Sequence, residues 1–326
     1  MKNIYLRLIA RRLLQIVPTM LGVVIFAFCL LGAAKGDLVD VMAAEAQIGD
    51  QTQIAALRKL YGVDVSLANQ MSNYVLATLR LDLGYSFRHN ASVTSLIMER
   101  LPATLLLLVS ALGLAVVAGS WLGIAAARRH NTGTDRAIST ISAVFFAVPN
   151  FWLSVMLVVL FSVKLRWFPV AGMESIGSIA GGLVGRAADI AHHLVLPAVS
   201  LGLLYAAIYV RVTRASMLSN MKLDFVRTAR AKGLPSRRIV YRHVLRNALL
   251  PVVTLVSLHI PSLFAGAVVV ETVFSWPGLG SLLMEAVGAR NYPVVMGVMI
   301  FSAGVVLVSN LVVDLLYMRL DPRVRL

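Results

Sequence analysis

Two side chains that can carry a proton lie inside long apolar stretches of this 326-residue chain, where a charge is costly. His259 is a candidate to line a substrate path, and the alternative is a histidine packed between helices. Asp314 follows Asn310 by one helical turn, and proton coupling is one interpretation of it. Because Asp314 lies near the end of its apolar stretch, we favour a structural ion pair with Arg319.

This chain lacks the residue patterns that enzymatic chemistry needs. No serine has the G-x-S-x-G spacing of a hydrolase nucleophile, and His192 and His193 have no second cluster of metal ligands. The single cysteine, Cys29, excludes a disulfide within the chain. A phosphate-binding loop requires a Gly-Lys pair, which the chain does not contain. The sequence therefore predicts no catalytic residue, no metal site and no cofactor in this chain.

The composition indicates a membrane protein, because 59% of the residues are hydrophobic and only 14% are charged. Ordinary globular chains have roughly 25% charged residues. The first apolar segment is about 22 residues long and exceeds the usual apolar region of a signal peptide, so we expect it to be retained. We predict an all-α, polytopic fold in a single domain, 1–326, with six transmembrane helices at about 12–34, 101–127, 137–161, 194–213, 248–270 and 294–318.

The distribution of charge predicts the orientation of these helices. The side that holds both termini receives 20 of the 30 Lys and Arg residues, whereas 11 of the 15 acids fall on the other side. The positive-inside rule therefore predicts that both termini are cytoplasmic. The net charge of +15 lies mostly in short loops, which favours membrane orientation over nucleic-acid binding. The segment 35–100 is then extracytoplasmic, with helix-like spacing at 50–61 and 67–81.

Proline, glycine and aromatic residues mark candidate bends and contacts. Pro149 in the third segment is a candidate gate, or a static bend that shapes the bundle. Gly119 and Gly123 have the small-xxx-small spacing that permits close packing of helices. Trp276 and Tyr85 lie in outer segments that predict either interfacial anchors or a gate and binding-protein contact.

A basic loop, residues 211–246, holds ten of the 30 Lys and Arg residues and one acid, Asp224. The spacing over 217–232 predicts a helix, and Gly233 is suited to end it in the left-handed conformation. Pro235 then suits the first turn of a second helix. This pattern predicts a compact elbow that docks on another protein and transmits movement. The alternative is that its arginines only orient the chain or bind lipid headgroups, at about 1 kcal/mol each.

The same loop carries a family resemblance. DFVRTARAKGL at 224–234 and RHVLRNALLPVVT at 242–254 resemble the EAA-motif loop of bacterial ABC importer permeases of the dipeptide/oligopeptide branch. This chain has Arg-Thr-Ala where the wider family has Glu-Ala-Ala, and its Leu-Pro pair comes later after the glycine than in sugar-type permeases. Further matching blocks occur in the family's order and cover the chain nearly end to end: LDLGYSF (81–87), ERLPATLLL (99–107), VPNFWLS (148–154), ETVFSWPGLG (271–280), NYPVV (291–295) and LDPRVR (320–325).

The resemblance implies a permease subunit of an ATP-driven importer in the bacterial inner membrane. Its partners would be a second, homologous permease chain, two ATP-binding subunits that hold ATP and Mg, and an extracytoplasmic substrate-binding protein. The small residues at positions 229 and 231 would seat in a groove of the ATPase, and the implied coupling residues are Asp224, Arg227, Thr228, Ala229, Arg230, Ala231, Lys232 and Gly233. Two alternatives remain: a secondary transporter, or an importer of nickel, glutathione, opines or sugars in place of peptides.

Overall fold

The computed structural model describes residues 2–33, 39, 50–60, 66–80, 82–86, 88–175 and 182–320. The chain divides into two compact units, one formed by Met1–Pro102 with Gly278–Leu326 and the other by Ala103–Pro277. This division does not test the prediction of a single domain over 1–326, which stays a prediction.

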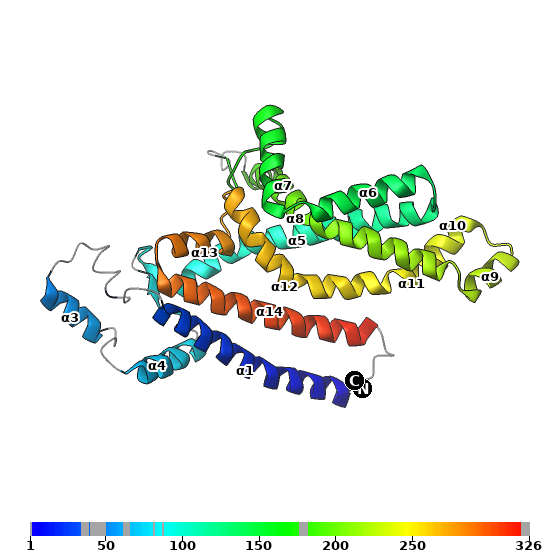
Figure 1. The fold of residues 1–326 in the computed structure, drawn as a ribbon. Coiled ribbons are helices and arrows are strands. Elements are labelled where there is room, and N and C mark those ends of the chain that lie inside the picture. The colour runs from blue at the N-terminus through cyan, green and yellow to red at the C-terminus, as the bar shows by residue number, and fades with distance from the viewer. Residues whose placement is uncertain are drawn as a thin grey trace. The chain divides into compact units, whose positions relative to one another are not determined.

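The first unit is built around two long helices, α1 (Lys2–Ala33) and α14 (Tyr292–Leu320), which lie side by side in opposite directions (Figure 1). The start of α1 and the end of α14 therefore lie at the same end of this unit, as the even number of predicted spans requires. The cytoplasmic location of that end stays a prediction. The helix α1 begins ten residues before the predicted span, so the basic N-terminal residues are part of the same helix as the apolar segment.

Shorter elements complete the first unit. The predicted helices at 50–61 and 67–81 are confirmed as α3 (Gln51–Leu60) and α4 (Leu67–Leu79). A small antiparallel pair, β1 (Tyr85–Ser86) with β2 (Ala91–Ser92), leads into α5 (Val93–Arg128), and α13 (Leu279–Gly288) precedes α14. The Asn291 amide donates a 2.7 Å hydrogen bond to the buried Ser86 hydroxyl, which ties the start of α14 to β1.

In the second unit, α5 packs closely on α8 (Gly182–Asn220) through glycine. A methyl group at Gly119 would lie 2.7 Å from the Ala206 carbonyl oxygen, and one at Gly123 would lie 2.8 Å from that of Val210. Such distances leave no room for a Cβ atom against rigid backbone. The close helix contact predicted from the glycine spacing is confirmed.

The third predicted span is not one continuous helix. It forms α6 (Gly133–Ala147) and then α7 (Asn150–Leu157) with the π-helical turn η1 (Val158–Lys164), and the two parts are bent by 105°. The cause is Pro149, which forces the residue before it out of the helical region, and Val148 is indeed extended. The bend expected at Pro149 is therefore present, and it is a complete break in the helix where the sequence indicated a kink.

Within the described residues, four helices are long and apolar enough to cross a membrane, or up to six if each of two bent pairs counts as one span. The four are α1, α5, α8 and α14, and the bent pairs are α6 with α7–η1, and residues 236–248 with the start of α12 (Leu250–Val273). Six spans are therefore reached only with interrupted helices, since proline or a local change of helix type lies at each break.

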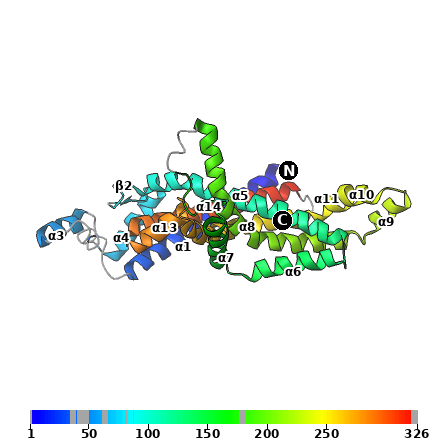
Figure 2. The same cartoon turned by 90° about the horizontal axis from the view of Figure 1, so that it is seen from above.

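The basic loop also differs from its predicted extent. The helix α8 continues to Asn220, so residues 211–220 are the end of a long helix and not part of a loop. The rest forms α9 (Asp224–Ala231), α10 (Ser236–Arg238), the π-helical η3 (Ile239–Val244) and α11 (Leu245–Ala248). We call residues 221–248 the elbow. Figure 2 shows α9 and α10 at one end of the second unit, beyond α6 and the end of α8.

Candidate coupling surface

The elbow turns sharply at Gly233, whose φ is +73°. The Gly233 N–H donates to the Arg230 carbonyl (2.9 Å) and the Leu234 N–H donates to the Ala229 carbonyl (3.2 Å). These two bonds form a Schellman motif, which satisfies carbonyls that the end of α9 would leave unpaired. The predicted glycine turn is confirmed. Pro235 differs from prediction by one position, because it lies in extended backbone just before α10 and not in its first turn.

The elbow has a hydrophobic core of its own. Val226 and Ala229 on α9, the first arm of the elbow, are buried in a hydrophobic cluster. The cluster extends to the ends of α5 and α8 and to the second arm, residues 236–248, through Ala127, Met217, Ile239, Val244 and Ala248. Because these contacts join both arms, the elbow is a packed body and not a flexible connector. They also correct one prediction: Ala229 is only 6% exposed and faces this core, so it is not available to seat in a partner.

The opposite face of α9 is exposed and cationic. This face and the turn that follows α9 present the remaining predicted coupling residues, all of which are exposed to solvent: Asp224, Arg227, Thr228, Arg230, Ala231, Lys232 and Gly233. Asp224 lies at the start of the helix, where a negative charge is favourable. It accepts a 3.4 Å hydrogen bond from the Arg227 guanidinium, but with side chains 93% and 80% exposed this pair contributes little stability. The face is therefore free to pair with acids of another protein.

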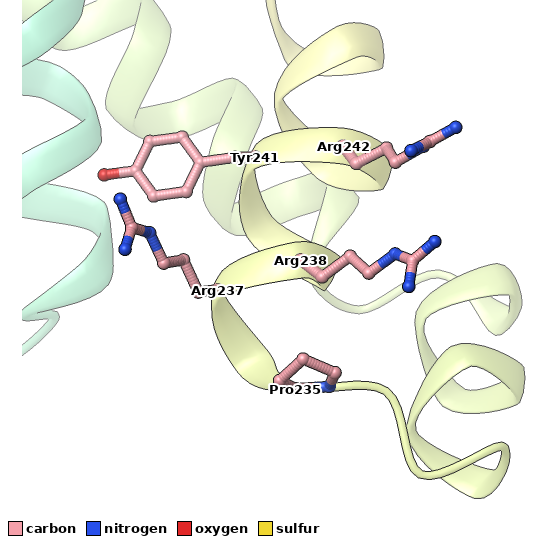
Figure 3. A pocket seen from close by; sticks show the side chains of 5 residues that line it. All are labelled: Pro235, Arg237, Arg238, Tyr241 and Arg242. Carbon is pink, nitrogen blue, oxygen red and sulfur yellow. The ribbon is translucent and has the colours of Figure 1, made fainter.

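Beyond the glycine turn, the second arm has an open pocket of about 650 Å³ lined by Pro235, Arg237, Arg238, Tyr241 and Arg242 (Figure 3). In Figure 3 the Arg238 and Arg242 side chains project from the same face, one turn apart, whereas Arg237 and Tyr241 lie together on the other face. The arginines thus extend the cationic surface of α9 onto the second arm.

The end of α8, from which the elbow extends, and the second arm of the elbow are both anchored to the turn between α5 and α6 by side chains that sequence reasoning missed. The Arg214 guanidinium, near the end of α8, donates to both carboxylate oxygens of Asp135, at 2.6 and 2.8 Å. On the second arm of the elbow, Tyr241 accepts a 3.0 Å hydrogen bond from Arg128, whose guanidinium also lies 5.5 Å from the ring centroid. The sequence feature that could have indicated this anchoring is Asp135 itself, because acids are rare on the predicted cytoplasmic side.

The candidate pathway residues have packing contacts. His259 lies 3.2 Å from the Tyr209 hydroxyl through Nδ1, and its ring contacts Tyr205, which fits the packed-histidine interpretation. Trp276 is fully buried and donates a 2.9 Å hydrogen bond to the Ala103 carbonyl. An interfacial anchor needs an exposed ring, so that interpretation of Trp276 is wrong. Roles for His259, Pro149 or Trp276 in a pathway or gate stay predictions.

Asp314 and Arg319 both belong to α14, but their side chains lie outside the described part of the structure, so the ion pair between them stays a prediction. In the described parts of the chain, no group of three or more His, Cys, Asp or Glu residues is arranged to hold a metal ion.

Comparison with known proteins accounts for this arrangement. Residues 119–326 match the family described as binding-protein-dependent transport system inner membrane component, and residues 5–108 match the N-terminal family of such membrane components. The chain belongs to this family. It is a multi-pass permease subunit of an ABC importer in the bacterial inner membrane, and ATP hydrolysis takes place on separate chains. ATPase and binding-protein partners follow in general terms from the family.

Relatives of this permease match over nearly their whole length. It is 38% identical to the di/tripeptide transport system permease protein DppB of Pseudomonas aeruginosa, over 98% of this chain and 99% of the relative. It is also 38% identical to the oligopeptide transport system permease protein AppB of Bacillus subtilis, over 97% and 98%. The MetNI methionine ABC transporter in an inward-facing conformation shares the fold, with a TM-score of 0.54 and 16% identity over 70% of this chain and 97% of that chain.

Proposed function

We propose that this permease forms one half of the translocation pathway of an importer for short peptides. The observation that carries the proposal is the near-complete match to permeases named for di/tripeptide and oligopeptide transport. A glutathione transport permease of Salmonella choleraesuis is 37% identical over 98% of this chain. Since glutathione is itself a modified tripeptide, it is the second candidate substrate, ahead of nickel, opines and sugars.

We further propose that the complete importer contains a second, homologous permease, two ATP-binding subunits and an extracytoplasmic binding protein. The exposed cationic face of α9 supports contact with an ATPase, because it offers arginines that lack buried partners. The absence of a Gly-Lys pair from the sequence agrees with a motor on other chains.

In this mechanism the elbow transmits the movement of the ATPases. ATP binding draws the two ATPase subunits together, and α9 moves with the subunit on which it docks. The hydrophobic core that joins α9 to the ends of α5 and α8 makes the elbow move as one body. The packed helices then convert this displacement into alternating access. The residues of this chain perform no covalent step.

The test is uptake by proteoliposomes that contain the permease, its partner permease, the ATPase subunits and the binding protein. Labelled dipeptide, tripeptide, longer peptide and glutathione are compared with and without ATP inside the vesicles. We expect ATP-dependent uptake of peptides that requires the binding protein. Uptake that persists without ATP would support a secondary transporter, and saturable uptake of only a non-peptide solute would reject the peptide assignment.

A further inference from the structure

Residues 128–135, which join α5 to α6, contact the elbow at Tyr241 and the end of α8 at Arg214. Arg128, the last residue of α5, contacts Tyr241 on the second arm. Asp135, in the first turn of α6, binds Arg214 on α8, seven residues before the elbow begins. These two contacts are only seven residues apart in the turn, yet they reach segments on either side of α9.

The contact at Asp135 is a built, buried structure. Asp135 is only 3% exposed, and its carboxylate accepts three hydrogen bonds: two from Arg214 and one of 3.0 Å from the Asn131 backbone N–H. His130 Nδ1 also lies 3.2 Å from the same carboxylate. A two-pronged guanidinium–carboxylate contact fixes orientation as well as distance. It therefore resists rotation of the end of α8 relative to the start of α6.

The contact at Tyr241 has a different character. The Tyr241 side chain is 44% exposed, so hydrophobic packing alone does not hold it in place. Arg128 combines a hydrogen bond to the hydroxyl with a cation–π contact to the ring, which together define where the second arm lies relative to α5. In Figure 3 the Tyr241 hydroxyl points toward the neighbouring helix and away from Arg238 and Arg242.

We propose that residues 128–135 are a second coupling element, and that Asp135, Arg214, Arg128 and Tyr241 are positioning residues which pass movement of the elbow to α6. The proposal rests on the proposed function, in which α9 docks on an ATPase. Movement of the second arm or of the end of α8 pulls on this turn, and α6 begins within it and ends at the break before Pro149. The elbow thus reaches the bent pair α6–α7 directly, in addition to its route through α8 and α12.

The experiment measures uptake per ATP hydrolysed in proteoliposomes of the complete importer. Asp135→Asn keeps the size of the side chain and removes its charge, and Arg214→Lys keeps the charge but loses the two-pronged contact. Arg136→Gln is the matched control, because Arg136 is the exposed neighbour of Asp135 on α6. Mutations along a coupling network typically change coupling by roughly 2- to 30-fold. We expect uptake per ATP to fall within that range for Asp135→Asn, less for Arg214→Lys, and not at all for Arg136→Gln.

A second variant keeps the test decisive if Asp135→Asn does not assemble. Tyr241→Phe retains the ring and removes only the hydroxyl that Arg128 contacts, and it should also lower uptake per ATP. The proposal is overturned if assembled variants keep the parental ratio, or if uptake and ATP hydrolysis fall together in proportion to the amount of complex. Failure of the proposed function is distinguishable, because the parent importer itself would then show no ATP-dependent uptake.

Discussion

Substitutions at Gly233 test whether coupling depends on the backbone conformation of the elbow turn or on the side chains at its surface. Gly233 has a φ of +73°, and a Cβ atom added there would have no neighbour within 4 Å. A side chain at this position therefore meets no steric obstacle in the folded elbow, and its cost comes from the backbone conformation. For an L-residue the left-handed region costs about 1–2 kcal/mol, and β-branched residues are the least tolerant.

This reasoning gives an ordered series of variants. At about 1.4 kcal/mol per factor of ten, a cost near 2 kcal/mol for Gly233→Val shifts the equilibrium for forming the turn by roughly 30-fold. Gly233→Ala should lie between Val and Gly. Gly233→Asn should remain close to the parent, because asparagine adopts the left-handed conformation several-fold more often than most residues. All three variants should insert in the membrane normally, since the turn lies outside the apolar helices.

The assay is binding-protein-stimulated ATP hydrolysis and peptide uptake in the same proteoliposomes. We expect uptake per ATP to decrease in the order Gly, Asn, Ala, Val, with Val uncoupled while basal hydrolysis continues. Parental coupling in the valine variant would refute the role of the turn. If asparagine is as damaging as valine, the effect comes from the added side chain, for example against the docked ATPase, and the backbone argument is wrong.

Three further predictions test the surface and the packing of the elbow and bundle. The double change Arg227→Gln with Arg230→Gln should reduce co-purification with the ATPase subunits, and unchanged recovery would instead support the lipid-headgroup interpretation. Ala229→Leu overpacks the buried hydrophobic cluster and should destabilise the protein by about 1–3 kcal/mol, which would lower the thermal midpoint of unfolding in detergent. The control Ala231→Leu should leave that midpoint unchanged and weaken only ATPase binding. Gly119→Ala places a methyl group 2.7 Å from the Ala206 carbonyl oxygen, so the yield of folded protein should fall sharply, as size-exclusion profiles would show.

Local patterns in the sequence predicted those parts of the fold that depend on local physics. Hydrophobic segment length predicted the apolar helices, and the Gly233 turn followed from the need for positive φ at the end of α9. At Pro149 the sequence predicted a bend but not its size. Proline at that position implies a bend, but its size of 105° depends on how α7 packs on α8, where Ser154 and Ser200 lie 2.6 Å apart through their hydroxyl oxygens.

The anchoring of the elbow was not predictable from one sequence, because its partners are far apart in the chain. Asp135 and Arg214 are 79 residues apart, and Arg128 and Tyr241 are 113 apart. The inward orientation of Ala229 was missed for a related reason. Small size alone is compatible with either face of α9, and only the packing against Ile239 and Val244 decides which face is buried.

The two arms of the elbow share one hydrophobic cluster, and the second arm is held by Arg128, so the elbow should move as one body and its displacement must be absorbed elsewhere. The described part of this unit has two sharp interruptions: the 105° bend at Val148–Pro149, and the 41° bend between α11 and α12 at Leu249. Pro149 and Pro251 lack a backbone N–H at or beside these bends, which makes the bends easier to deform than the proline-free turns of α8, a helix that is continuous for 39 residues. Hydrogen exchange on the complete importer, with and without bound ATP, should therefore change most at residues 147–150 and 248–251. A change confined to 232–235 would place the hinge inside the elbow and contradict the rigid-body mechanism.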